Sequence, residues 1–172
     1  YEACPTEGTG DAMRGFPLLR KAHCMFGWDW GPRLPDMGIW RSVSLWGVDG
    51  GRIDSVYITQ RHEDGCVFLD FDPTLEDLSV RAHLSITVTA PDGRQFFSGG
   101  ETLKIDNPQL WWPNGLGEQP LYCVCVQLCE GDAVLDTWSR RIGLRTLTVD
   151  TSADAYGSRF AHVVNGVPFF AM

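Results

Sequence analysis

The amino-acid sequence predicts an all-β protein whose main part is an immunoglobulin-like β-sandwich. Between residues 52 and 149, short runs of alternating apolar and polar residues are separated by clusters of turn-forming residues. No stretch shows the i, i+3, i+4, i+7 spacing of an amphipathic helix over more than about two turns. About six to eight short strands with this spacing are typical of two packed antiparallel sheets. The Cys–Trp–Cys core of antibody domains is absent, so the sequence predicts the architecture alone.

The strands of the sandwich can be placed in order along the chain. Residues 80–88 alternate most clearly, whereas residues 121–129 are apolar on both parities, which predicts a central strand covered on both faces. In the turn at 91–94 (Pro-Asp-Gly-Arg) the proline fixes φ and the glycine accepts positive φ, and residues 130–132 (Glu-Gly-Asp) close a hairpin. The expected strands cover residues 52–61, 67–71, 80–88, 95–98, 101–105, 121–129, 134–142 and 144–149, the last as an extension or as a further strand.

The two flanks of the sandwich differ from it and from each other. Residues 1–50 are rich in Gly and Pro and end in a run at 39–45 that alternates like one strand, so we expect the tail of a preceding domain. Residues 150–172 begin with a polar link and finish in a hairpin closed by Asn165-Gly166, the strongest two-residue turn signal. Because the chain does not start with Met, we expect an internal piece of a longer protein.

Charge and hydropathy argue against several classes of partner. The formal net charge is -8 and no run of Lys and Arg exceeds two residues, which argues against binding to nucleic acid or to anionic membranes. No stretch approaches 18 apolar residues, so no membrane-spanning segment is expected. The first residues lack the basic start and apolar run of a signal peptide.

The cysteines are interpreted as buried free thiols. Cys123, Cys125 and Cys129 share parity within one expected strand, where neighbours at i and i+2 are poorly aimed for a disulfide. No His lies nearby in sequence to complete a metal site, so neither a metal nor any other cofactor is expected. Reduced cysteines favour a cytoplasmic location. The six cysteines are Cys4, Cys24, Cys66, Cys123, Cys125 and Cys129.

One stretch combines the side chains that bind sugars. Trp28, Asp29 and Trp30 lie between Gly27 and Gly31, so a carboxylate stands between two indoles in a Gly-rich turn. Sugar C–H faces stack on indole rings, and a carboxylate accepts hydrogen bonds from paired hydroxyls. The alternative is structural: the indoles fill a domain boundary and Asp29 caps a turn. The residues alone leave both readings open.

Two further stretches are better explained by structure. Trp111-Trp112 could form a second sugar platform, but the stronger interpretation is that one indole folds back and pins the long loop at 106–120. The arginines in residues 140–145 (Arg-Arg-Ile-Gly-Leu-Arg) are expected to pair with acidic groups at a domain interface. None of the glutamates has the setting of a glycosidase catalytic acid, so no catalytic residue is assigned.

These motifs together resemble the β-mannosidase branch of glycoside hydrolase family 2. The resemblance is most specific in residues 19–41, which contain Trp28-Asp29-Trp30. Residues 111–122, 140–145 and 164–168 complete the match in the order found in the family. Ser42 stands where proline is frequent, and Phe169-Phe170-Ala171-Met172 replaces the continuation usual in the family.

The resemblance implies an order of domains. Residues 1–50 would be the C-terminal part of a jelly-roll (galactose-binding-like) domain and residues 51–149 the sandwich. Residues 150–172 would be the lead-in hairpin to a (β/α)8 barrel that holds both catalytic glutamates. It also implies that Asp29, together with Trp28 or Trp30, contacts the terminal mannose of a β-mannoside or manno-oligosaccharide substrate. Without a barrel, the chain alone is expected to fold around the sandwich and to be inactive.

Two other functions remain open from the sequence. The first is a family 2 exo-glycosidase for another sugar, such as an exo-β-glucosaminidase, which can share the Trp-Trp-Pro motif at residues 111–113. The second is a free-standing carbohydrate-binding module, which an acidic and Trp-rich sandwich would suit. The Trp-Asp-Trp triplet favours mannose over the first alternative, and the incomplete flanks argue against the second.

Overall fold

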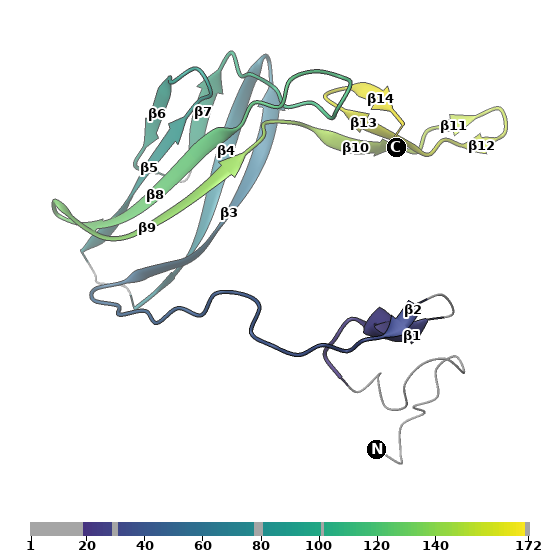
Figure 1. Ribbon diagram of the computed structural model, residues 1–172. Helices are drawn as coiled ribbons and strands as arrows, with labels where there is room; N and C mark the ends of the chain where they lie inside the picture. Colours follow the sequence, from purple (N-terminus) through teal and green to yellow (C-terminus); the bar gives the residue numbers. More distant parts are fainter. Residues whose placement is uncertain (1–18, 29–30, 78–80, 101, 171–172) are drawn as a thin grey trace. The chain divides into compact units, whose positions relative to one another are not determined.

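The computed structural model describes residues 19–28, 31–77, 81–100 and 102–170 of the chain. They fall into two compact units: an N-terminal unit that ends at Trp46 and a C-terminal unit that begins at Gly47. Within the described residues the only helical element is the 3-10 turn η2 (His23–Met25), and the other elements are strands, so the all-β prediction is confirmed (Figure 1). No helix among the described residues is long and apolar enough to cross a membrane.

The C-terminal unit contains the predicted two-sheet sandwich (Figure 1). One sheet has the order β3-β4-β7 and the other has the order β6-β5-β8-β9, with every neighbouring pair antiparallel. Division into two antiparallel sheets of three and four strands is the architecture of the immunoglobulin class. The strands are β3 (Arg52–Glu63), β4 (Cys66–Glu76), β5 (Ala82–Thr89), β6 (Gln95–Ser98), β7 (Thr102–Asp106), β8 (Tyr122–Glu130) and β9 (Ala133–Ile142).

Tight turns connect the strands, and those at Gly93 and Gly131 lie where the sequence predicts them. In the β5–β6 turn, Gly93 has a φ of 87°, and the Ala90 N–H donates to the Arg94 carbonyl at 2.8 Å. The β8–β9 hairpin turns through Gly131, whose φ is 58°. An Asp64-Gly65 turn with φ values of 48° and 79° joins β3 to β4, the positive-φ geometry that suits the right-handed twist of a hairpin.

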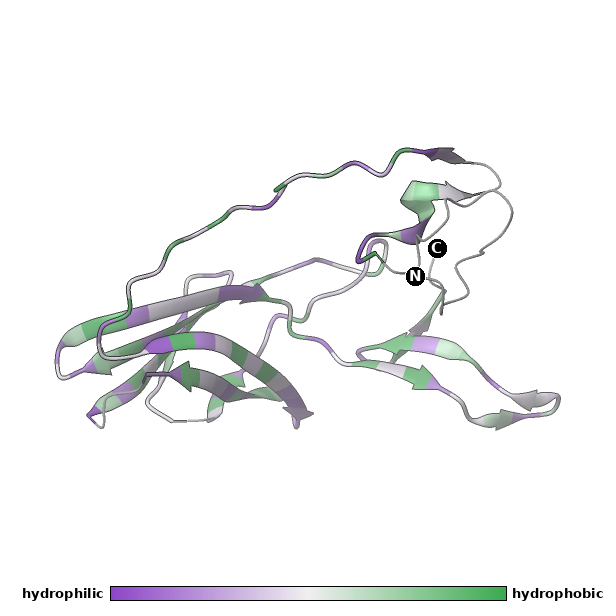
Figure 2. Cartoon of the chain, turned by 90° about the horizontal axis from the view of Figure 1, so that it is seen from below, coloured by the Kyte–Doolittle hydropathy of each residue, from purple (hydrophilic) through white to green (hydrophobic). Residues whose placement is uncertain are grey.

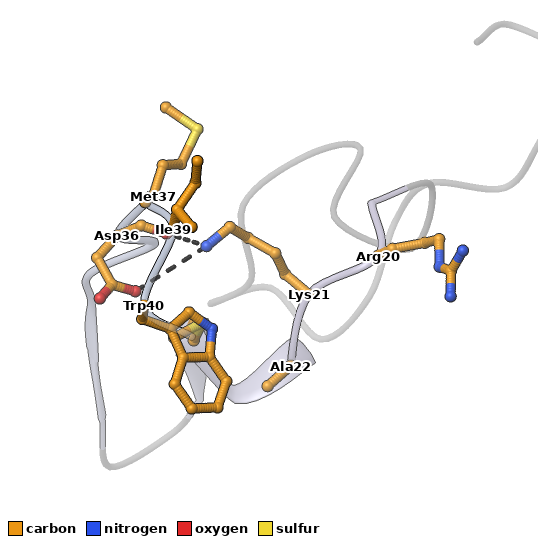
Figure 3. A pocket seen from close by; sticks show the side chains of 9 residues that line it. Arg20, Lys21, Ala22, Asp36, Met37, Ile39 and Trp40 are labelled. Atoms are coloured by element: carbon orange, nitrogen blue, oxygen red, sulfur yellow. Dashed lines mark hydrogen bonds and ion pairs between the residues drawn. The ribbon is translucent and has the colours of Figure 1, made fainter. Parts of the chain in front are cut away.

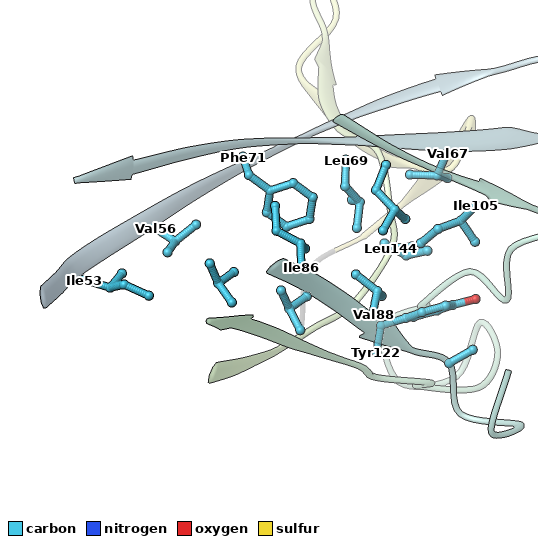
Figure 4. Packing of buried hydrophobic residues seen from close by; sticks show 14 of the residues in the cluster. Ile53, Val56, Val67, Leu69, Phe71, Ile86, Val88, Ile105, Tyr122 and Leu144 are labelled. Atoms are coloured by element: carbon cyan, nitrogen blue, oxygen red, sulfur yellow. The ribbon is translucent and has the colours of Figure 1, made fainter. Parts of the chain in front are cut away.

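Side chains from both sheets meet in one hydrophobic core (Figure 4). Hydrophobic and hydrophilic residues alternate along the long strands (Figure 2). Tyr122 is fully buried, and its hydroxyl accepts the Gln109 N–H at 2.8 Å, so the one polar atom of this ring has a partner. The fully buried members are Val67, Leu69, Ile86, Val88, Ile105, Tyr122, Val124, Val126, Leu128 and Leu144.

Two β-bulges adjust which side chains reach the core. In β3 the pairing shifts between Ile53 and Ser55, so Asp54 is the extra residue, and Ile53 and Val56 are both buried although three positions apart. In β9 the pairing passes from Asp136 to Val134, and the extra residue, Leu135, packs against the core. The Ile53 N–H donates to the Asp136 carboxylate at 2.8 Å, which ties the two sheets together at this end.

The outer face of β8 is more open than the sequence predicts. Cys123 is exposed and Cys125 is half-buried, so the prediction of a strand covered on both faces and of buried thiols along it is wrong for these positions. From Tyr122 to Leu128 the even-numbered side chains of β8 are buried in the core, whereas the odd-numbered ones between them lie on the outer face. Burial is confirmed only for Cys129 among the described cysteines, all of which are free thiols: Cys24, Cys66, Cys123, Cys125 and Cys129.

A smaller sheet follows the sandwich. The strands β10 (Leu147–Asp150), β13 (Ala161–Val164) and β14 (Val167–Phe169) pair in the order β10-β13-β14, and β11 (Ala153–Asp154) and β12 (Gly157–Ser158) form a separate ribbon (Figure 1). Asn165 and Gly166 close the β13–β14 hairpin with φ values of 48° and 80°, as the sequence predicts. Residues 144–149 therefore do not extend β9: Leu144 enters the core and a new strand begins at Leu147.

The strand predicted at residues 39–45 is wrong. These residues are outside any strand, and the side chains of Ile39, Trp40, Val43 and Leu45 are exposed. A strand needs a neighbour that binds its N–H and C=O groups. Within the described part of the N-terminal unit, the only sheet is the two-stranded ribbon β1-β2, which pairs with itself alone.

Candidate functional site

The candidate sugar-binding stretch lies in a short β-hairpin of the N-terminal unit. Strand β1 (Phe26–Trp28) pairs with β2 (Gly31–Arg33), with Phe26 opposite Arg33 and Trp28 opposite Gly31. The Leu34 N–H donates to the Met25 carbonyl at 3.0 Å and continues the ladder below the strands. The chain passes from β1 to β2 through Asp29 and Trp30, which lie outside the described residues, and the side chain of Trp28 lies outside them as well.

Two residues before the triplet explain why the hairpin forms here. Phe26 is 3% exposed and is the one buried apolar side chain among the described residues of this unit. Gly27 is buried with a φ of 105°, a conformation that residues with a Cβ rarely adopt. The backbone of β1 therefore requires glycine immediately before the triplet. The assignment of Trp28, Asp29 and Trp30 to sugar binding stays a prediction.

A hollow of about 780 Å³ opens elsewhere in the same unit (Figure 3). Lys21 reaches across it, where its ammonium group donates to the Asp36 carbonyl and lies 3.9 Å from the Asp36 carboxylate. The Trp40 ring is 82% exposed, and the Arg41 guanidinium lies 4.3 Å from its centroid, so one face of this indole is already occupied. No group of acidic, His or Cys side chains that could hold a metal ion occurs among the described residues.

The tandem tryptophans have the structural role that the sequence favoured. Trp111 is half-buried, and its backbone N–H donates to the Leu144 carbonyl at 2.9 Å. A Cβ placed on Gly143 would lie 2.8 Å from the Trp111 ring, so the indole packs directly on the glycine backbone. Trp112 closes the loop on itself, since its backbone N–H donates to the Glu118 carbonyl at 2.9 Å. The Trp111 contacts therefore pin the loop at 106–120 to the segment that follows β9.

Two of the three arginines of residues 140–145, Arg140 and Arg145, contact aromatic rings. The Arg145 guanidinium lies 4.8 Å from the centroid of Trp111, and that of Arg140 lies 5.7 Å from Trp138. No carboxylate of the described residues forms an ion pair with either arginine. The expectation of pairing with acids is therefore not met within the part of the chain that the structure describes. Stacking on an indole is a common alternative for a guanidinium.

A histidine near this segment predicts a pH dependence of stability. Burial lowers the pKa of His62 from its usual 6.5, and a hydrogen bond to the backbone of Arg145 opposes this shift. The folded chain therefore disfavours protonated His62, so stability is present above pH 6.5 and is lost as the pH falls through the lower folded pKa. We expect a lower Tm at pH 5.5 than at pH 7.5 in thermal unfolding. The variant His62→Gln should flatten this dependence, and His83→Gln, at an exposed position, should not.

Comparison with known proteins places both parts of the chain in one family. Residues 52–145 match the sequence model of the glycosyl hydrolases family 2, and residues 2–41 match that of the glycosyl hydrolase 2 galactose-binding domain-like family. The predicted galactose-binding-like character of the first part is thereby confirmed. The β-mannosidase B of Aspergillus flavus is 32% identical over 174 residues, which cover 94% of this chain and 20% of that protein. That of Aspergillus niger is 32% identical over 173 residues, which cover 88% of this chain.

Solved structures agree with this assignment. The β-D-mannosidase from Dictyoglomus thermophilum is 30% identical with a TM-score of 0.75, and the match covers 88% of this chain and 20% of that one. A β-glucuronidase from Ruminococcus gnavus shares the fold, with a TM-score of 0.57 at 14% identity. The chain spans about a fifth of the length of the curated relatives it matches. On its sequence and its fold, this chain belongs to glycosyl hydrolase family 2.

Proposed function

We propose that this chain is the accessory segment of a longer retaining exo-β-mannosidase, which removes terminal β-D-mannose residues. One observation carries the proposal: relatives that match nearly the whole chain at about 30% identity are named β-mannosidases, both among the sequences and among the solved structures. The chain would then contribute a scaffold and one loop that contacts the substrate.

The substrate-contacting loop in this proposal is the connection between β1 and β2. The resemblance to the β-mannosidases assigns contact with the terminal mannose to Asp29, together with Trp28 or Trp30. The paired strands support the proposal because they fix both ends of this connection, with Trp28 directly opposite Gly31. A carboxylate held in this way can accept hydrogen bonds from two hydroxyls of one sugar ring.

The chemical step is assigned to residues outside this chain. Retaining hydrolysis needs two carboxyl groups about 5–5.5 Å apart across the sugar. Two glutamates of the sandwich are instead engaged in surface ion pairs: Glu63 lies 3.1 Å from Arg61, and Glu76 lies 3.5 Å from Arg52. We therefore propose that the isolated chain folds but hydrolyses no glycoside, and that both catalytic glutamates lie in the barrel.

Substrate preference of the longer protein tests the function. We expect hydrolysis of an aryl β-mannoside with a kcat/KM at least about tenfold above that for an aryl β-glucosaminide, since one sugar hydroxyl in a site built to bind it contributes at least this much discrimination. The measurement is the initial rate on both substrates at matched concentrations. A preference for the glucosaminide would contradict the proposal and favour the exo-β-glucosaminidase alternative.

The isolated chain tests the remaining alternative. A free-standing carbohydrate-binding module would bind manno-oligosaccharides by itself, and binding near its tryptophans would change their fluorescence. Under the proposed function we expect no saturation at millimolar ligand, because the barrel supplies the rest of the site. Saturable binding tighter than millimolar would identify a binding module instead.

A further inference from the structure

Three stretches that are distant in the sequence meet at one end of the sandwich. They are the loop that carries Trp111, the segment from Gly143 to Thr146 that follows β9, and the β13–β14 turn at Asn165. Each lies in a separate motif of the family resemblance. Their contacts form one continuous set of hydrogen bonds, called the junction below.

Trp111 is fixed from both sides of its backbone in the junction. Its N–H donates to the Leu144 carbonyl at 2.9 Å, and its own carbonyl accepts the side-chain amide of Asn165 at 3.0 Å. The ring packs on Gly143 and lies under the Arg145 guanidinium. The indole therefore has little freedom to move. The side chain of Asn165, which donates to the backbone carbonyl of Trp111, is held in place with it.

Asn165 uses every polar group of its side chain. Besides the bond from its Nδ2 to Trp111, its Oδ1 accepts the Thr146 N–H at 3.0 Å. The backbone completes the pair, because the Asn165 N–H donates to the Thr146 carbonyl at 3.1 Å. Closing a hairpin at a φ of 48° requires only tolerance of positive φ, which glycine also supplies. The side-chain bonds go beyond what the turn needs.

Gln60 holds the segment after β9 from the other sheet. Its Nε2 donates to the Gly143 carbonyl at 3.1 Å, and its Oε1 accepts the Arg145 N–H at 3.1 Å. The backbone on both sides of Leu144, which is fully buried, is thus fixed by one amide of β3. The partner to which Asn165 is fastened is therefore itself rigidly attached to the core.

We propose that Asn165 is a positioning residue that fastens the β13–β14 hairpin to the sandwich and so fixes the direction in which the chain leaves it. Three hydrogen bonds connect this one residue to Trp111 and Thr146. The consequence for catalysis rests on the proposed function, in which the hairpin leads into the catalytic barrel. Asn165 then acts on the reaction only through the orientation of that barrel.

A matched pair of glycine variants tests the fastening. Asn165→Gly keeps the turn geometry and removes both side-chain bonds. Asp64→Gly makes the same change in the Asp64-Gly65 turn, which has nearly the same φ values. In hydrogen exchange we expect the protection of the backbone amides at positions 146 and 165 to fall about tenfold or more in Asn165→Gly, the loss typical of one or two partly buried hydrogen bonds. Asp64→Gly should leave both amides unchanged. Equal protection in Asn165→Gly and the parent chain would overturn the inference.

The activity of the longer enzyme tests the positioning role. We expect Asn165→Gly to lower kcat/KM on an aryl β-mannoside and Asp64→Gly to leave it unchanged. In Asn165→Asp the Thr146 N–H keeps an acceptor, but at neutral pH a carboxylate replaces the amide that donates to the Trp111 carbonyl. Protonation restores a donor, so its kcat/KM relative to the parent should rise as the pH falls from 7.5 towards 4, where an aspartate with the usual pKa of about 3.9 becomes protonated. A role in the turn alone predicts a ratio independent of pH.

The outcomes separate this inference from the proposed function. Lost protection in Asn165→Gly supports the fastening even if the longer protein does not hydrolyse β-mannosides, in which case the proposed function fails alone. Full activity of Asn165→Gly in an active β-mannosidase, despite lost protection, would overturn the positioning role. A ratio for Asn165→Asp that does not change with pH would overturn it as well.

Discussion

Replacement of Asp29 by alanine in the longer enzyme should lower kcat/KM on an aryl β-mannoside by a factor on the order of 100 to 1,000. This corresponds to about 3–4 kcal/mol, the range expected for losing two hydrogen bonds from sugar hydroxyls to a charged acceptor. The loss should appear in steady-state kinetics under first-order conditions, with the Tm of the enzyme nearly unchanged. A variant with kcat/KM near that of the parent would assign Asp29 a structural role.

Two controls separate the charge of Asp29 from a role in the turn. Asparagine caps turns as aspartate does, so Asp29→Asn should retain full activity if the residue is only structural, and should lose most of it if the carboxylate binds substrate. Asp36→Ala removes an exposed carboxylate of the same unit, whose ion pair with Lys21 spans 3.9 Å. An exposed pair of this kind contributes little, and we expect kcat/KM within about twofold of the parent.

Replacement of Leu144 by alanine should destabilise the C-terminal unit by about 2–5 kcal/mol. Leu144 is 0% exposed and lies between Gly143 and Arg145, whose backbones are both bound to Gln60. Because this backbone cannot easily move to fill the space, we expect a cavity that remains open. Urea unfolding followed by circular dichroism, with a two-state fit, measures the change in the free energy of unfolding.

The chain contains a matched control for this measurement. Leu147 is the same residue type three positions later, at the start of β10, and is 60% exposed. Leu147→Ala should therefore change the free energy of unfolding by less than about 1 kcal/mol. Equal losses in the two variants would show that the junction, rather than the core, limits the stability of this region.

Most of the sandwich could be predicted from the sequence, because its strands bury one face and expose the other. Residues 82–88, part of the stretch with the clearest alternation, lie in β5. Glycine at positive φ marked the turns at Gly93 and Gly131. The alternation at residues 39–45 predicted a strand that does not form. Alternation indicates which side chains a strand would bury, but a strand also needs a neighbour to pair with, and no such strand occurs among the described residues of that unit.

The features that the sequence did not reveal depend on contacts between distant residues. Asn165 was recognised only as a turn residue, although its side chain binds Thr146 and Trp111. Gln60 lies on the same face of β3 as the buried Val56, and a polar residue at such a position could have indicated a side-chain hydrogen bond. Cys123 is exposed because no other segment among the described residues covers it on the outer face of β8. The local sequence of β8 does not contain this information.

The candidate site was recognised from the rarity of its composition rather than from any periodic pattern. A carboxylate between two indoles is uncommon in a structural turn, and this alone drew attention to Asp29. The geometry around it could not be inferred in the same way, because the conformation of Gly27 and the burial of Phe26 arise from the pairing of β1 with β2.

The two β-bulges have a consequence for how this chain is aligned with its relatives. Each bulge is a one-residue insertion within a strand, at Asp54 in β3 and at Leu135 in β9. An alignment without a gap beside these residues would match inward side chains with outward ones along the rest of the strand. Relatives that lack either bulge should therefore show a single-residue deletion inside a strand, where alignments normally place none.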